Sequence, residues 1–219
     1  MIYKLDLHTH SLASPDGSLR LSDYATMIAD GTLDFVAITD HNRIDFALEA
    51  REKLGDAIIV GEEITTIEGE LIGLFLKEAV PAGKTAQETA ELIHAQGGLV
   101  YVPHPFETVR KGVTPAALYK ISKLVDIMEI YNGRALFQNK STQSEAWARS
   151  HHKPGAASSD AHGRIGWGNT YSEVAVLPAP KTLAKALQQA RYDKQLVGLR
   201  GIAYPKFNRV RKWLEAHGV

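Results

Sequence analysis

Residues 3–11 read YKLDLHTHS, a short alternation of apolar and polar side chains that ends in two histidines. Such alternation predicts a β-strand, in which every second side chain points to the same face. Asp6, His8 and His10 would then share one face near the end of the strand. Imidazole and carboxylate groups together suit Zn, Mn or Fe, although a single pair of this kind is about as often structural. A second same-face pair, Asp160 and His162 in residues 155–162, favours a metal site built from strand ends.

The same pattern, an apolar run followed by an amphipathic segment, recurs along the chain. We expect strands at residues 3–8, 33–41, 57–65, 70–77, 99–105, 125–132, 155–162 and 171–177, with the third and fourth forming a hairpin and the last at a sheet edge. We expect helices at residues 21–31, 45–55, 85–98, 114–122, 143–152 and 181–191. Thr85 with Glu88 predicts a capping box, and Thr114 before Pro115 predicts a second helix start.

Strands that alternate with helices favour a parallel α/β sheet. Polar residues follow nearly every apolar run, from His8 near the start of the chain to His162. In an open sheet, only the strands that flank the switch point would need such residues at their ends. Polar residues at strand ends all along the chain are typical of a closed barrel, whose active site is built from the ends of many strands. We therefore expect a barrel.

Composition limits the function further. The 219 residues suit one domain, expected over residues 1–219, and the formal net charge is zero. This balance argues against a surface built for nucleic acid. The absence of cysteine excludes thiolate metal sites and cysteine catalysis. No apolar run approaches a membrane span, and the start MIYKLDLHTH lacks the apolar core of a signal peptide. A cytoplasmic enzyme is expected.

The nine histidines fall into two groups. The first group lies at expected strand ends and supplies candidate metal ligands: His8, His10, His41, His104 and His162. The second group lies late in helices or in the tail, where an imidazole commonly favours the negative end of the helix dipole. For these four we expect no role in the site: His94, His151, His152 and His217.

Six segments resemble the ordered motifs of the PHP (polymerase and histidinol phosphatase) family of metal-dependent phosphoesterases. They are DLHTHSLASPDGS, FVAITDHN, VGEEIT, VYVPHP, DIMEIYNGR and ASSDAH, between residues 6 and 162. The resemblance implies a distorted seven-stranded (β/α) barrel that binds two or three divalent ions, here Mn, Zn or Fe.

The resemblance also implies a set of metal ligands. The first ion would be held by His8, His10, Glu63 and Asp160. Glu63 would bridge to a second ion, which His104 also binds, and the third would be held by Asp16, His41 and His162. Glu63 is preferred to Glu62 because the family pattern places the glutamate two residues after Gly61. Glu63, Asp160 and His162 would carry most of the catalysis.

Two further features qualify the resemblance. Some family members supply another histidine to the second ion, and here Phe75 stands at about that position, so the second ion would be weaker, water-filled or absent. Asp6 and Asp40 are expected behind the ligands, where a carboxylate can hold an imidazole tautomer.

The implied activity is hydrolysis of a phosphate ester by a metal-bound hydroxide. Arg134 and Arg164 are candidate substrate-binding residues, because arginine suits bidentate phosphate contact and both follow the ends of ligand-bearing strands. Asn132, at the end of the segment EIYN, is a third candidate, placed to approach the metals or the substrate. Glu63 and His104 are only 41 residues apart, which leaves no room for a large covering insertion. The expected substrate is therefore a small phosphomonoester or a nucleotide. The basic residues of 206–213, expected as a short amphipathic helix, support nucleic-acid binding only weakly.

Two alternatives stay open. The same metal site could hydrolyse a C–N bond, as in the related amidohydrolases. The chain could also be a metal-stabilised module without catalysis. Oligomeric state is not predicted.

Overall fold

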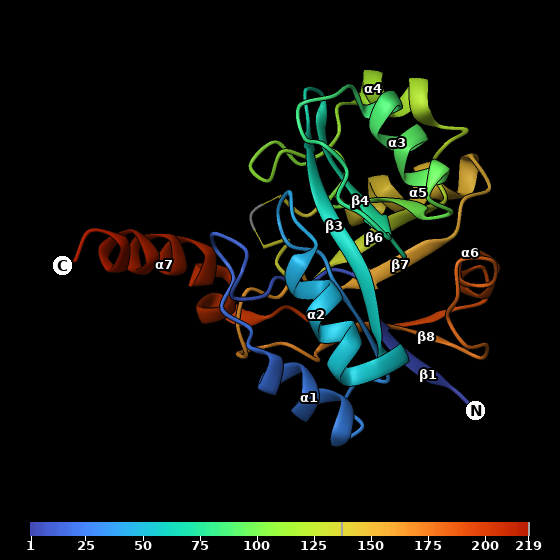
Figure 1. Cartoon of the computed structure of the whole chain (residues 1–219). Coiled ribbons are helices and arrows are strands. Elements are labelled where there is room, and N and C mark those ends of the chain that lie inside the picture. Colours follow the sequence, from blue (N-terminus) through green and yellow to red (C-terminus); the bar gives the residue numbers. More distant parts are fainter. Residues whose placement is uncertain (137, 219) are drawn as a thin grey trace.

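Nine strands form one sheet in the part of the chain that the computed structural model describes, residues 1–136 and 138–218 (Figure 1). Their order in the sheet is β7-β6-β5-β4-β3-β2-β1-β8-β9. The strands are β1 (Tyr3–Asp6), β2 (Phe35–Ile38), β3 (Ile58–Thr66), β4 (Gly69–Leu74), β5 (Leu99–Val102), β6 (Ile127–Asn132), β7 (Gly155–Ser158), β8 (Thr170–Val174) and β9 (Arg191–Lys194).

The sheet mixes parallel and antiparallel pairs. β1, β2 and β3 run parallel to one another, as do β5, β6 and β7, whereas β4 is antiparallel to both of its neighbours. The predicted hairpin is confirmed, because Thr66 pairs with Gly69 across the turn between β3 and β4. The parallel strands on either side of this hairpin present their carboxyl ends on the same side of the sheet.

The ends of the sheet come back together. Beyond β1 and β7, Thr9 and Ala161 form an isolated parallel bridge, and His10 N–H donates to Ala161 O at 2.8 Å. The Ala157 N–H also donates to Ser172 Oγ of β8 at 2.9 Å. The result is a nearly closed barrel. The α/β class is therefore confirmed, but the expected seven strands are wrong, because β8 and β9 extend the sheet beyond β1.

The helices agree with the expected segments up to residue 150. They are α1 (Leu21–Ala29), α2 (Asp45–Leu54) with a short 3-10 turn (Gly55–Ala57), α3 (Ala86–Ala95), α4 (Pro115–Ile121) and α5 (Ser141–Ser150). The capping box is confirmed: Thr85 Oγ1 accepts from Glu88 N at 3.1 Å, and Glu88 Oε2 accepts from Thr85 N at 2.9 Å. The second helix start is confirmed as well, with Thr114 as the cap and Pro115 in the first turn.

The last third of the chain departs from the expectations. The segment 171–177 is not a sheet edge, because β8 pairs with both β1 and β9. The helix expected over 181–191 shrinks to α6 (Leu183–Leu187), since its end enters β9, the true edge. The expected short helix at 206–213 is the middle of α7 (Gly198–Ala216), which extends outward from the rest of the molecule (Figure 1). Gly201 and Pro205 are poor helix formers and hid its first turns.

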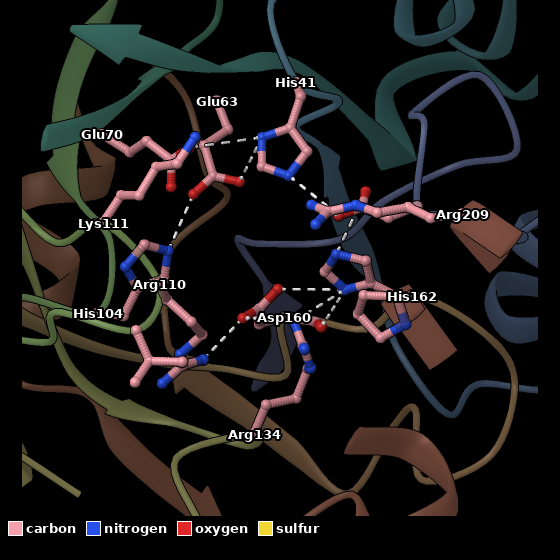
Figure 2. A pocket seen from close by; sticks show the side chains of 13 residues that line it. His41, Glu63, Glu70, His104, Arg110, Lys111, Arg134, Asp160, His162 and Arg209 are labelled. Atoms are coloured by element: carbon pink, nitrogen blue, oxygen red, sulfur yellow. Dashed lines mark hydrogen bonds and ion pairs between the residues drawn. The ribbon is translucent and has the colours of Figure 1, made fainter. Parts of the chain in front are cut away.

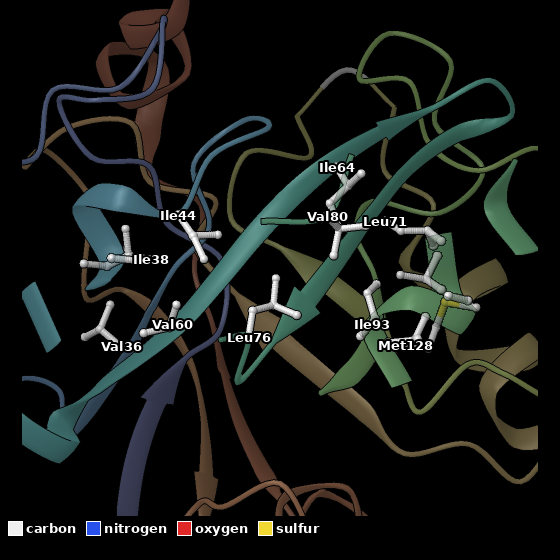
Figure 3. Packing of buried hydrophobic residues seen from close by; sticks show 14 of the residues in the cluster. Val36, Ile38, Ile44, Val60, Ile64, Leu71, Leu76, Val80, Ile93 and Met128 are labelled. Carbon is white, nitrogen blue, oxygen red and sulfur yellow. The ribbon is translucent and has the colours of Figure 1, made fainter. Parts of the chain in front are cut away.

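Two apolar clusters stabilise the barrel. The smaller one gathers side chains from β1 to β8, among them Leu5, Ile59 and Tyr101, together with Leu183 of α6. Side chains from so many strands can meet only inside a curled sheet, so this cluster fills the barrel interior. The larger cluster joins strands to the surrounding helices, and its members include Val60, Ile64, Leu71, Ile93 and Met128 (Figure 3). No helix among the described residues is long and apolar enough to cross a membrane.

Candidate metal centre

The strand ends converge on one cavity of about 240 Å³ (Figure 2). It is lined by Asp16, His41, Glu63, Glu70, His104, Val109, Arg110, Lys111, Arg134, Asp160, His162, Pro205 and Arg209. His8 and His10 lie fully buried beneath it. All eight residues expected to bind metal therefore meet here, and each belongs to a group whose ligand atoms lie within 4.8 Å of one another.

Glu63 lies at the centre of this arrangement. Its Oε2 is 3.4 Å from His8 Nε2, 3.2 Å from His10 Nε2 and 3.3 Å from His41 Nδ1. Its other oxygen, Oε1, is 2.9 Å from His104 Nε2. The two oxygens of one carboxylate thus face different sets of imidazoles, which is the geometry that a bridging ligand needs.

Asp160 faces the same histidines from the opposite side. Its Oδ1 lies 3.6 Å from His8 Nε2 and 3.5 Å from His10 Nε2. Its Oδ2 accepts from Arg110 at 2.7 Å and from Arg134 at 3.2 Å. Asp160 also has a positive φ of 54°, which is uncommon outside glycine and directs the chain away from β7 directly after the strand.

A third group forms around Asp16. Asp16 Oδ2 is 3.5 Å from His41 Nε2, and Asp16 Oδ1 is 3.5 Å from His162 Nε2. His10 completes this group. Burial lowers the pKa of His162 to about 3, and the charges of His10 and Arg134 act in the same direction. His162 is therefore neutral at pH 7, as a metal-ligating imidazole must be.

These residues fit divalent cations. His8 Nε2 and His10 Nε2 lie 3.1 Å apart, and at most one proton can be shared between two such nitrogens. Burial would lower the pKa of His8, but the carboxylates of Asp160, Glu63 and Glu129 raise it well above its ordinary value. The cluster thus draws positive charge into the barrel. Every candidate ligand is a nitrogen or oxygen, the donor set that Zn, Mn and Fe accept.

Glu129 of β6 is a site residue that sequence reasoning missed. Its fully buried carboxylate accepts from His8 Nδ1 at 3.1 Å, Tyr101 Oη at 2.8 Å, His104 N at 2.5 Å and Asn132 Nδ2 at 2.9 Å. Holding His8 through Nδ1 leaves Nε2 free to face the cavity. The sequence signals were an acidic residue inside the apolar run IMEIY and its place within the motif DIMEIYNGR.

Asp6 and Asp40 do not hold imidazole rings. Asp6 accepts from Ser159 N at 3.0 Å, Ser159 Oγ at 2.5 Å and Trp167 Nε1 at 3.2 Å. Asp40 accepts from the backbone and side chain of Ser11 at 2.7 and 2.5 Å. The alternation expected through His10 stops early, because β1 ends at Asp6. These carboxylates therefore fix the ligand-bearing loops.

Glu62 and Glu63 occupy different surroundings. Glu62 Oε2 accepts from Val80 N at 2.8 Å, on the side of β3 away from the cavity, and burial raises the pKa of Glu62 to about 7. Glu70 of β4, which sequence reasoning missed, reaches the cavity and groups with His41 and Glu63. Burial and the nearby Glu63 raise the pKa of Glu70 to about 9.

Phe75 lies beyond the far end of β4 and lines a separate apolar cavity.

Of the three candidate substrate-binding residues, Arg134 and Asn132 lie at the cavity and Arg164 does not. Arg134 lines the cavity, and its Nη1 is 3.2 Å from His162 Nδ1. Asn132 is buried beside the cavity, where it accepts from Arg110 Nη1 at 2.5 Å. Arg164 is not brought to the cavity: its side chain is 71% exposed, and its Nε lies 3.5 Å from Asp23.

Three positively charged residues at the cavity rim were not predicted from the sequence motifs: Arg110, Lys111 and Arg209.

The four histidines expected to lie outside the site are absent from the cavity lining and from the described groups of candidate ligands. His94 pairs with Asp126 at 2.7 Å, and His151 and His217 stack on Trp147 and Trp213.

Known proteins are similar to this chain in sequence and in fold. The chain is 37% identical over 123 residues to uncharacterized protein MJ1587 of Methanocaldococcus jannaschii, covering 50% of this chain and 72% of that protein. It is 33% identical over 191 residues to uncharacterized protein MJ0417 of the same organism, covering 81% and 73%.

Among solved structures, a two-domain protein from Bacteroides vulgatus superposes with a TM-score of 0.70 at 23% identity, covering 95% of this chain and 70% of that one. Its title describes it as containing a predicted PHP-like metal-dependent phosphoesterase. At this identity the likeness shows the fold. The family model described as the PHP domain matches residues 6–217. The protein therefore belongs to the PHP domain family.

Proposed function

We propose that this protein is a metal-dependent phosphoesterase that hydrolyses small phosphomonoesters or nucleotides. The observation that carries the proposal is the composition of the cavity, which combines buried imidazoles and carboxylates with cationic side chains at its rim. The first set suits dications, and the second suits the anionic oxygens of a phosphate ester. A neutral amide or lactam carries no anionic oxygen for these cations to bind in the ground state, so the rim favours a phosphate ester over the C–N alternative.

The proposed ligands are His8, His10, Asp16, His41, Glu63, His104, Asp160 and His162, and they would hold two or three ions of Mn, Zn or Fe. Such ions, when bound, lower the pKa of water from about 15.7 to about 7 and neutralise charge on phosphoryl oxygens. Glu63 is the proposed bridging residue, because its two oxygens face different imidazoles.

The chain itself would bind and orient the ester. Arg134 and Lys111 line the cavity on different sides, and Arg134 lies between Asp160 and His162. An ester phosphate in the cavity would meet the Arg134 guanidinium and would be held against the ligand groups. Arg110 is largely committed elsewhere, since it donates to Glu107, Asn132 and Asp160. We therefore assign Arg110 to holding the site together and Arg134 to binding the phosphate.

The test combines elemental analysis with a release assay on the same reconstituted sample. We expect at least two transition-metal ions per chain and phosphate release from phosphomonoesters or nucleotides. Amides and lactams serve as the comparison substrates. Hydrolysis of these, with no phosphate release, would support the C–N alternative, and bound metal without any turnover would support a non-catalytic module.

A further inference from the structure

Helix α7 is attached to the loops that carry two candidate ligands. The buried Asn208 donates through Nδ2 to Asp16 O at 2.7 Å and to His162 O at 3.0 Å. One turn later, Lys212 Nζ donates to Leu12 O at 2.6 Å. These bonds hold the helix backbone in place beside the cavity, although almost 200 residues separate Asp16 from α7 in sequence.

Arg209, between these two anchors, is held much less firmly. Its Nη2 lies 2.6 Å from Asp16 Oδ2, while its side chain is 63% exposed at the cavity rim. The side chains of Arg110 and Arg134 are only 14% and 12% exposed and contact several partners each. Among the described residues of the rim, Arg209 is thus the arginine whose guanidinium can turn without breaking a buried network.

The oxygen that Arg209 contacts has a second potential partner. Asp16 Oδ2 is also 3.5 Å from His41 Nε2, inside the group that His10 and His162 complete. A dication on this group and a guanidinium on the same oxygen would repel each other. Arg209 therefore competes with a cation for Asp16.

We propose that Arg209 is a substrate-binding residue that leaves Asp16 for the substrate's phosphate when a divalent cation occupies the Asp16 group. The inference rests on the proposed function for the identity of the substrate. Before exchange, the guanidinium neutralises Asp16 and weakens cation binding there. After exchange, its planar fork is available at the rim for bidentate contact with phosphoryl oxygens.

The cation arm of the test uses Mn²⁺ alone. Metal-free wild type, Arg209→Ala and Arg211→Ala are titrated by calorimetry, and Asp16→Asn identifies the binding step that belongs to the Asp16 group. We expect Arg209→Ala to bind Mn²⁺ in that step about two- to fivefold more tightly, the range of an exposed ion pair. Arg211 is a matched control on α7, since its Nε lies 3.6 Å from Glu215 Oε1 and it does not line the cavity. Damage to the fold would weaken binding instead.

The phosphate arm uses inorganic phosphate and the Mn²⁺-loaded proteins. Loss of a charged hydrogen-bonding group should weaken phosphate binding by roughly tenfold or more in Arg209→Ala. Arg211→Ala should match wild type. Arg209→Lys should lie between wild type and Arg209→Ala, because lysine keeps the charge but not the fork.

Two results overturn the inference: Mn²⁺ binding in Arg209→Ala that is no tighter than in wild type, or phosphate binding that is unchanged. Neither arm needs turnover. A wild-type protein that binds Mn²⁺ and phosphate but hydrolyses no ester would refute the proposed function and leave the exchange by Arg209 intact.

Discussion

Neighbouring residues of β3 show how strongly the surroundings decide the role of a side chain. Glu63 faces four imidazoles in the cavity, whereas Glu62 faces the backbone of Val80 on the other side of the strand. Both are buried glutamates, so composition and burial alone do not distinguish them. The alternation of a strand does, because consecutive side chains point to opposite faces.

Glu63→Gln should abolish most phosphoesterase turnover, since it removes the charge opposite two ions while keeping the volume. The variant should lose several kcal/mol of transition-state stabilisation. Since every 1.36 kcal/mol is about a factor of ten in rate, we expect kcat to fall at least about a hundredfold. The measurement is kcat for phosphate release at saturating Mn²⁺. Glu62→Gln is the control and should retain turnover. The opposite pattern would place the wrong glutamate in the site.

Glu129→Gln should weaken metal binding although Glu129 is not itself a proposed ligand. An amide offers a donor where the carboxylate accepts from His8, Tyr101 and two further groups, so His8 loses its fixed orientation. Loss of such an outer partner costs about 10- to 100-fold in metal affinity. Asp126→Asn is the matched control, because Asp126 also holds an imidazole, that of His94, but outside the cavity. Equal Mn²⁺ affinity in the two variants would contradict this role.

At the scale of elements, α7 is anchored through a small number of polar contacts. Asn208 is buried and bonds the backbone of two ligand loops, whereas the neighbouring Phe207 is 62% exposed. The stability of this attachment should therefore depend on Asn208 much more than on the larger apolar side chain beside it.

Asn208→Ala should lower the free energy of unfolding by about 1–3 kcal/mol, because two buried carbonyls lose their donor. Urea unfolding gives the loss, and limited proteolysis should show earlier cleavage within α7. Phe207→Ala serves as the comparison and should change neither measurement much. Equal stability of the two variants would mean that α7 is held by other contacts.

At the scale of the whole molecule, the candidate ligands join distant parts of the barrel. They come from loops after β1, β2, β5 and β7 and from β3 itself, over residues 8 to 162. Burying five imidazoles and three carboxylates together opposes folding, because burial disfavours charged groups, and the described arginines at the rim contact only two of the carboxylates, Asp160 and Asp16. Bound cations should therefore stabilise the closed barrel.

Removal of metal by a chelator should lower the melting temperature. A ligand that binds only the folded state adds about 4 kcal/mol when present at a thousandfold excess over its dissociation constant. Thermal unfolding before and after chelation measures the shift, and added Mn²⁺ should restore it. The shift should be smaller in Glu63→Gln. An unchanged melting temperature after verified removal of the metal would refute the prediction that bound metal stabilises the barrel.

Much of the site could be predicted because its signals are local. Strand periodicity and the placement of polar residues at strand ends pointed to the five histidines and to Glu63 and Asp160, and the resemblance added Asp16 and the role of each ligand. The structure brings all eight together. The helix caps at Thr85 and Thr114 could be predicted for the same reason, because a capping residue and its partner lie within three residues of each other.

The missed features depend on contacts between distant residues. Arg209 reaches Asp16 across 193 positions, and Glu129 reaches His8 across 121. Arg164 carries the same charge as Arg209 and follows a ligand motif, yet it points to Asp23 and solvent. The number of strands also depended on long-range pairing, because β9 is defined by its ladder with β8.

The sequence by itself determined the α/β class and the expectation of a barrel, because strand periodicity acts over a few residues, and its resemblance to the ordered PHP motifs pointed to the candidate metal ligands. Only the tertiary structure decided that Arg110, Lys111 and Arg209 line the cavity, that Glu129 holds His8, and that the sheet has nine strands. These choices depend on contacts between residues far apart in the sequence, such as Arg209 with Asp16 and Glu129 with His8, which form only when the chain folds back on itself.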